Sequence, residues 1–156
     1  MNPRNEASSL GPGGSSAWVE HALLALGEAG YHRGGARLAV IELLAREDCA
    51  MTALEIDERL RGAGEAVGRA SVYRVLDQLE ELRLVSKLEM GRGMASYERI
   101  EPTGEHHHHA VCERCGRIEP FEDPGLERAI DRLEAKVGFR VSDHEVMLRG
   151  RCRRCA

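Results

Sequence analysis

The stretch HHHHAVCERCG, from His106 to Gly116, contains four consecutive histidines and a CxxC pair. The apolar residues after the histidines, and RIEPF after the glycine, predict a strand, a metal knuckle and a returning strand. Successive side chains of a strand point to opposite faces, so His106 and His108 share one face, and His107 and His109 share the other. Neutral imidazole is a ligand for zinc, iron, nickel and copper. The run therefore predicts halves of two metal sites, and a solvated polar strand is the alternative.

Two CxxC pairs flank the C-terminal third of the chain: Cys112 with Cys115, and Cys152 with Cys155. Zinc favours a tetrahedral set of four thiolates at closed structural sites. In a reducing compartment this spacing indicates zinc, and two reducible disulfides or redox thiols are the alternative. The segment between the pairs has room for a helix and two strands, so zinc would clip the ends of a subdomain together. Cys49 stands alone and is predicted to be a small buried hydrophobe near a helix end.

Each histidine pair needs further ligands, and three residues are candidates. His144 lies in VSDHEVML, which predicts a strand, and Glu98 lies in ASYERIE, just upstream of the histidines. Glu127 lies in PGLERAIDRLEAKVGF, which predicts a helix with Gly138 as its C-cap. The apolar stripe of that helix consists of Leu126, Ile130, Leu133 and Val137.

The composition is that of a soluble globular protein, with 42% hydrophobic and 31% charged residues among 156. No apolar stretch approaches the ~20 residues that span a bilayer. Residues 1–16, rich in Gly, Ser and Pro, predict a disordered tail and no signal peptide, so we expect a cytoplasmic protein without membrane contact. The formal charge of −4 disfavours a non-specific DNA binder, and any DNA contact must come from a few local arginines.

The N-terminal half predicts four helices and a hairpin. Apolar spacing indicates helices at 17–29 and at 36–46, the second with a stripe of Leu38, Ile41, Leu44 and Ala45. Thr52 and Glu55 form a predicted capping box for a third helix, ALEIDERLRG. The fourth is GRASVYRVLDQLEELRLV, with Val72, Val75, Leu76, Leu79 and Leu82 on its buried face. VSKLEMGRGMASYERI then predicts two short strands around a turn at 91–93.

This order of elements is the winged helix-turn-helix plan, in which the last helix enters the major groove. The polar residues at the start of that helix are the predicted DNA contacts: Arg69, Ser71, Tyr73 and Arg74. Arginine reads guanine and binds phosphate, and hydroxyl groups bind phosphate. An ordinary helical subdomain with a polar first turn is the alternative.

GRASVYRVLDQL, YE, HHHHAVCERCG and DHEVMLRGRCRRC, in this order, resemble the ferric uptake regulator family. The resemblance covers nearly all of the chain from about residue 20. It implies an α+β fold, with a winged helix-turn-helix domain at 17–100, a hinge at 101–105 and a small α/β dimerisation domain at 106–156, clipped by the four-cysteine zinc site. It also implies a homodimeric, metal-responsive bacterial transcriptional repressor that binds double-stranded DNA.

The resemblance implies three metal sites, each with its own ligands. Structural zinc is held by Cys112, Cys115, Cys152 and Cys155. The sensing site takes Glu98, His107 and His109. The second site takes His106, His108, Glu127 and His144. The tyrosine–arginine pair of the reading helix falls on Tyr73 and Arg74.

The chain also departs from the family pattern. The histidine that many members place at the start of the third helix is missing from DCAMTALE, and Pro120 replaces a carboxylate. His32, Cys49 and Glu119 are the candidates to complete the sensing site. Arg83 replaces the glycine usual after the recognition helix.

The implied function is transcriptional repression by a dimer that closes on a palindromic operator when a regulatory metal ion is bound. The candidates for this ion are Fe²⁺ and Zn²⁺, with Mn²⁺ as a third choice. Glu98 resembles the pattern of the iron sensors. A peroxide sensor of the same fold is the rival within the class, and a metal-dependent enzyme and a metal store are the rivals outside it. We do not predict an enzyme, because no paired nucleophile and base is evident.

Overall fold

The computed structural model describes residues 12–32, 34–89, 93–102 and 106–156. The chain divides into two compact units, 1–104 and 105–156, and each is described by itself. The predicted hinge at 101–105 includes residues outside the described part, so its bounds stay a prediction.

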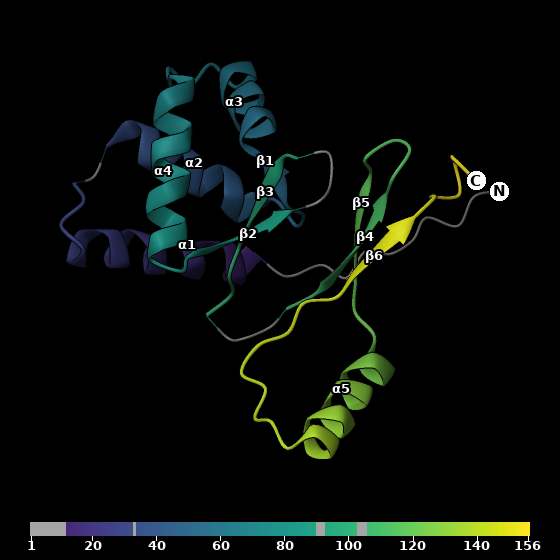
Figure 1. The fold of residues 1–156 in the computed structure, drawn as a ribbon. Helices are drawn as coiled ribbons and strands as arrows, with labels where there is room; N and C mark the ends of the chain where they lie inside the picture. The colour runs from purple at the N-terminus through teal and green to yellow at the C-terminus, as the bar shows by residue number, and fades with distance from the viewer. Residues whose placement is uncertain (1–11, 33, 90–92, 103–105) are drawn as a thin grey trace. The chain divides into compact units, whose positions relative to one another are not determined.

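The first unit is a winged helix-turn-helix fold (Figure 1). Its helices are α1 (Pro12–Glu28), α2 (Gly35–Arg46), α3 (Ala53–Gly62) and α4 (Arg69–Glu81). Strands β2 (Val85–Glu89) and β3 (Ala95–Arg99) form the predicted antiparallel hairpin. The sequence did not predict β1 (Met51–Thr52), a two-residue strand that pairs with β3 and gives the order β1-β3-β2. The predicted turn at 91–93 falls partly outside the described residues.

The core of this unit is aliphatic around one tryptophan. Its fully buried members come from all four helices of the unit: Trp18, Ala22, Val40, Ile41, Ile56, Val72, Leu76 and Leu79. The predicted buried face of α4 is confirmed at Val72, Val75, Leu76 and Leu79, and Leu82 is half-buried. Burying such side chains contributes about 1.5–3 kcal/mol each, which fixes the helices relative to the sheet.

The start of α3 is fixed by the predicted capping box. The Glu55 amide donates to Thr52 Oγ1 at 3.2 Å, and the Thr52 amide donates to Glu55 Oε2 at 2.7 Å. Both bonds satisfy amide groups that have no partner within the helix.

Two expectations for this unit were wrong. The helix α1 begins at Pro12, so residues 12–16 are helical instead of part of a tail. A proline fits the first turn of a helix because the missing N–H would have no helical partner there. Leu38 was expected on the buried stripe of α2 but is 41% exposed, since it lines a pocket beside α1.

The second unit is a three-stranded sheet with one helix. Its elements are β4 (His108–Cys112), β5 (Ile118–Phe121), α5 (Pro124–Val137) and β6 (Met147–Gly150). The strand order is β5-β4-β6, with β4 antiparallel to β5 and parallel to β6. The helix α5 is confirmed: Asp123 caps its start by accepting from Gly125 and Leu126 amides, and Gly138 ends it at a φ of 71°.

The strand expected at 141–148 is wrong for its first part. Strand β6 begins at Met147, and His144 lies in the irregular segment before it. The reason is the length of the partner strand: β4 begins at His108, and the first pair of β4 with β6 is His109 with Met147. Residues 141–145 therefore have no strand to pair with.

Cys49 is half-buried in the segment between α2 and β1, so the expectation of a buried residue was wrong. Within the described residues, no helix has both the length and the apolar character needed to cross a bilayer.

Candidate metal centres and the reading helix

The four-cysteine cluster forms because β4 and β6 are parallel. Cys112 ends β4 opposite Gly150, and Cys152 follows β6, so both CxxC pairs lie at the same end of these two parallel strands. The Sγ atoms of Cys115 and Cys152 are 3.8 Å apart, and all four sulfurs lie within 4.8 Å of one another. Zn–S bonds of about 2.3 Å at tetrahedral angles place sulfurs about 3.8 Å apart. The predicted zinc ligands therefore fit zinc.

The thiols of this cluster differ in pKa. The Cys152 amide, which donates to the Cys112 sulfur at 3.4 Å, and the amides of Cys115 and Arg114 lower the pKa of Cys112 to about 5. Hydrogen bonding to Cys115 and burial raise the pKa of Cys155 to about 12. The thiolate form is therefore favoured at Cys112 and disfavoured at Cys155, and zinc binding must release the protons that the thiols hold.

A second cluster joins His106, His108, Glu127 and His144, as predicted. Glu127 projects from the first turn of α5, and the histidines come from β4 with its preceding residues and from the segment before β6. The hydrogen bond from His108 is the main cause that lowers the pKa of Glu127. This carboxylate is therefore ionised and available as a ligand at neutral pH.

The spacing of these four side chains fits a metal ion. Glu127 Oε1 is 2.7 Å from His108 Nε2, and Glu127 Oε2 is 3.0 Å from His144 Nε2. The Nε2 atoms of His106 and His144 are 3.1 Å apart. Metal–ligand bonds of about 2.0–2.2 Å at tetrahedral angles separate ligand atoms by about 3.3–3.6 Å. The three contacts are shorter than that, so the four side chains converge on one point and would move apart, by more than half an ångström at the closest contact, to hold an ion.

The alternation of the histidine run is visible in the ring contacts. The rings of His107 and His109 are 4.9 Å apart, and those of His106 and His108 are 5.3 Å apart. The run therefore separates into two pairs, as the strand period predicts. Glu98 lies on β3 in the first unit, so its predicted joining with His107 and His109 stays a prediction.

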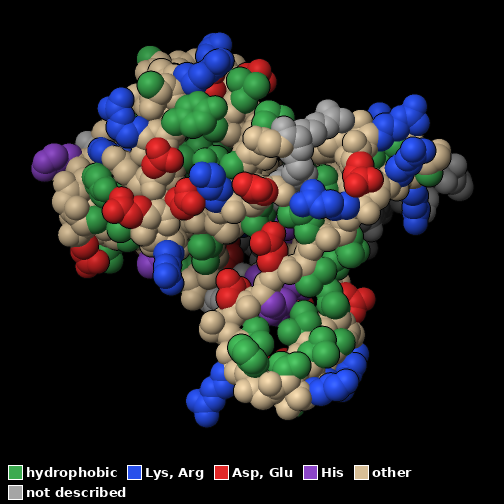
Figure 2. All heavy atoms as spheres, viewed as in Figure 1, with side chains coloured by type: hydrophobic (Ala, Val, Ile, Leu, Met, Phe, Trp, Pro, Cys, Tyr) green, Lys and Arg blue, Asp and Glu red, His purple; other side chains and the backbone are tan. Residues whose placement is uncertain are grey.

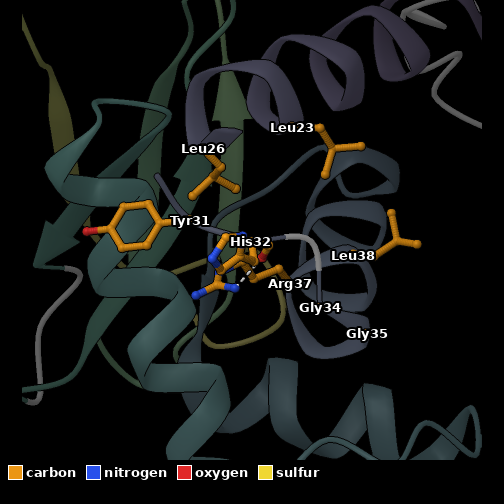
Figure 3. Close-up of a pocket in the computed structure, with 8 residues that line it drawn as sticks. All are labelled: Leu23, Leu26, Tyr31, His32, Gly34, Gly35, Arg37 and Leu38. Carbon is orange, nitrogen blue, oxygen red and sulfur yellow. Dashed lines mark hydrogen bonds between the residues drawn. The ribbon is translucent and has the colours of Figure 1, made fainter. Parts of the chain in front are cut away.

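The candidates to complete the sensing site differ in their surroundings. His32 lines a pocket of about 250 Å³ beside α1 and α2, together with Leu23, Leu26, Tyr31, Gly34, Gly35, Arg37 and Leu38 (Figure 3). Glu119 lies on β5, where its carboxylate pairs with Arg117 at 2.8 Å. Within the described residues, none of His32, Cys49 and Glu119 belongs to a group of three or more ligands.

The predicted DNA contacts lie at the start of α4. Arg69 is the first residue of the helix, and Ser71, Tyr73 and Arg74 follow within two turns. The buried residues of the helix are all apolar, so Arg69, Tyr73 and Arg74 stay at the surface. The structure holds no DNA, and these contacts stay a prediction.

Asp57 was not among the predicted site residues. Its carboxylate is fully buried on α3, and Oδ2 accepts from Arg61 Nη2 at 2.7 Å and from Arg69 Nε at 3.1 Å. The signal was present in the sequence: residues 53, 56 and 60 form the apolar face of α3, and Asp57 occupies the same face at helical spacing. A charge at a core position marks a residue that needs a partner.

The end of β3 and the residue after it are anchored to two helices of the winged unit. Arg99 Nη1 donates to the carbonyl oxygens of Ala45 at 2.7 Å and Glu47 at 2.9 Å, at the end of α2. The Trp18 indole on α1 donates to the Ile100 carbonyl at 3.1 Å. These hydrogen bonds tie residues 99 and 100 to α1 and to the end of α2.

Comparisons with known proteins find a matching family and similar relatives. A model of the ferric uptake regulator family matches residues 28–149. The ferric uptake regulation protein of Legionella pneumophila is 35% identical over 120 residues, 76% of this chain and 87% of that protein.

Two solved structures are similar over most of the chain. The ferric uptake regulator of Vibrio cholerae, reported to show a rearrangement of its DNA-binding domains, has a TM-score of 0.74 and 32% identity, covering 83% of this chain and 98% of that one. The ferric uptake regulator of Helicobacter pylori, reported with three functional metal binding sites, has a TM-score of 0.79 and 26% identity. The match covers 90% of this chain and 93% of that one.

Proposed function

Because this chain belongs to the ferric uptake regulator family, it is a metal-dependent DNA-binding transcriptional regulator, and we propose that it represses its targets as a homodimer in the cytoplasm. The observation that carries the metal dependence is the separation of four adjacent histidines into two ring pairs, one of which joins Glu127 and His144. A structural zinc site alone needs only the cysteines.

The sensing site that we propose takes Glu98, His107 and His109. Glu98 comes from the winged unit and the histidines from the other unit, so a divalent ion held by all three would link the two units. A ligand shifts such an equilibrium only by its differential affinity for the two arrangements. The linked arrangement is therefore the one that we expect to bind the operator.

The dimer that we propose forms through the second unit. The helix α5 has no buried residue, although one side of it is apolar. Figure 2 shows hydrophobic side chains gathered over α5, and the exposed ones of this region include Leu133, Val137 and Phe139, the last 71% exposed. A second copy of the same surface would cover this patch.

The operator that we propose is palindromic, because a two-fold dimer presents two reading helices about one helical turn of DNA apart. Arg69, Ser71, Tyr73 and Arg74 would contact it from the start of α4. The net charge of −4 means that affinity depends on such local cations.

The regulatory metal that we propose is Fe²⁺ or Zn²⁺, with Mn²⁺ as a third choice. Three nitrogen ligands and one carboxylate suit zinc as well as iron at the second site. Metal-by-metal titration of operator binding, under strict redox control and at fixed ionic strength, identifies the activating ion.

Two double variants test the assignment of the two sites. His107→Ala with His109→Ala should abolish metal-activated DNA binding and leave the second unit folded. His106→Ala with His108→Ala should remove one metal equivalent and destabilise the second unit, with a secondary loss of DNA binding. Each loss of two ligands should lower that site's metal affinity by more than the 10–100-fold of a single outer-shell change. Equal metal stoichiometry and equal operator affinity in both variants would mean that the histidines form one cluster.

The other functions predict different observations. A peroxide sensor predicts oxidation of a histidine when the iron-loaded protein meets peroxide. A metal store predicts no sequence-specific footprint on DNA, and an enzyme predicts turnover of an ester or phosphoester. The family consists of transcriptional regulators, so we propose that the chain has no enzymatic activity.

A further inference from the structure

Asp57 connects the two helices of the helix-turn-helix through one oxygen atom. Arg61 lies one turn further along α3, and Arg69 is the first residue of α4. Both guanidinium groups lie within 3.1 Å of Asp57 Oδ2, so they also lie close to each other. Without a carboxylate between them, two cations at this distance would repel.

The buried carboxylate is a poor device for stability alone. Asp57 Oδ1 is buried and has no hydrogen-bond partner among the described residues. Burial of a charge is costly, and replacing a buried ion pair as a whole by apolar side chains of similar volume is often neutral or stabilising. The arrangement is better explained by what it does to the two arginines.

The two arginines are held but remain open to solvent. The Arg61 side chain is 65% exposed and the Arg69 side chain 56%. A guanidinium has five N–H donors in a planar fork, and each arginine uses one of them on Asp57. The remaining donors are open to solvent, and those of Arg69 lie at the start of α4, where a helix N-terminus also favours an anion.

We infer that Asp57 is a positioning residue for DNA: it holds Arg61 and Arg69 as a pair of contacts to the phosphate backbone beside the reading helix. This inference rests on the proposed function and adds Arg61 to the predicted DNA contacts. Asp57 itself does not touch the nucleic acid, and it acts by orienting two cations that would otherwise separate.

Asp57→Asn distinguishes positioning from simple electrostatics. The variant removes a negative charge next to two DNA-facing cations, so electrostatics alone predicts tighter binding. Positioning predicts that operator affinity falls at least about tenfold and that the salt dependence weakens by about one unit of slope for each arginine released. Glu58→Gln is the matched control, because Glu58 is exposed on the same helix and the charge change is the same.

Coupling to the arginines shows how Asp57 acts. In full-length, metal-loaded protein, Asp57→Asn should add less than about twofold to the loss caused by Arg61→Gln with Arg69→Gln, since uncoupled sites would add fully. Arg69→Lys keeps the positive charge but loses the planar guanidinium donors, so it should also weaken operator binding about tenfold. This variant tests the inference with the buried Asp57 left in place. Metal titration and the thermal midpoint show whether each variant is folded.

Several results would overturn the inference. The first is that Asp57→Asn binds the operator as tightly as Glu58→Gln does. The second is that Arg69→Lys binds it as tightly as the parent. The third is that Asp57→Asn lowers operator affinity as much in the Arg61→Gln, Arg69→Gln double variant as in the parent. Random-sequence DNA is titrated in parallel, because phosphate contacts need neither an operator nor a metal. A parent that binds DNA without metal dependence contradicts the proposed function, but the salt slopes still test Asp57. A parent that binds no DNA contradicts both.

Discussion

Arg99→Met should destabilise the winged unit by about 2–3 kcal/mol. The Arg99 side chain is 9% exposed, and its Nη1 donates to the carbonyl oxygens of Ala45 and Glu47. Hydrogen bonds from a charged group contribute about 1.5–3 kcal/mol each. Methionine keeps the aliphatic contacts but has no hydrogen-bond donor. Water near the end of α2 can bind the carbonyl oxygens in its place, so the predicted loss of stability is smaller than the sum of the two hydrogen bonds.

Urea titration followed by tryptophan fluorescence measures this change. Trp18 is the one tryptophan of the sequence, and it is fully buried in the winged unit. With a urea m-value of about 2 kcal/mol per M, the midpoint should fall by about 1–1.5 M at unchanged m. The fluorescence reports the unit that contains Arg99, whether or not the second unit unfolds in the same step.

Arg46→Met is the control on the same helix end. Arg46 pairs with Glu42 at 3.3 Å, and both side chains are exposed, at 69% and 45%. Exposed pairs at this spacing contribute about 0.3–0.5 kcal/mol. If Arg99→Met lowers the midpoint no more than Arg46→Met does, the carbonyl contacts of Arg99 do not hold β3 to α2.

Three further predictions concern zinc, DNA and assembly. Cys152→Ser should release zinc and melt the second unit, because structural zinc supplies folding free energy on the order of 10 kcal/mol; a thermal midpoint equal to the parent's in chelator would contradict it. Arg74→Ala should weaken operator binding by about 1–3 kcal/mol per subunit without changing metal affinity, and an unchanged gel shift would refute this reading helix. Leu133→Glu should raise the dimer dissociation constant, measured by analytical ultracentrifugation, whereas Glu58→Gln should not; a dimer as tight as the parent's would exclude this side of α5 from the interface.

Local patterns predicted the winged unit well. The capping box at Thr52, the α4 stripe and the hairpin follow from residues near in sequence, and all three are observed. The strand β1 has only two residues, too short for a periodic signal, and it exists because β3 offers a partner. The position of Asp57 on the apolar face of α3 was visible in the sequence, but its pairing with Arg69 was not, since Arg69 is on another helix.

The metal clusters were predictable where chemistry restricts the choice. Two CxxC pairs leave zinc with one evident set of ligands, and strand alternation divides four histidines into two pairs. The place of His144 was less predictable, because the start of β6 depends on where β4 begins. Tertiary pairing, which a local pattern does not contain, decides such boundaries.

The parallel pairing of β4 with β6 sets the order in which the protein can mature. Cys115 and Cys152, which meet at the zinc site, are 37 positions apart in the sequence. Strand β4 has no parallel partner until β6 has been synthesised. Domains fold as they emerge from the ribosome, N-terminal first, and non-local pairings form late. The unit that reads DNA is therefore complete before the unit that responds to metal. A newly made chain therefore passes through an interval in which its winged unit can fold while the metal clusters of the second unit are not yet assembled.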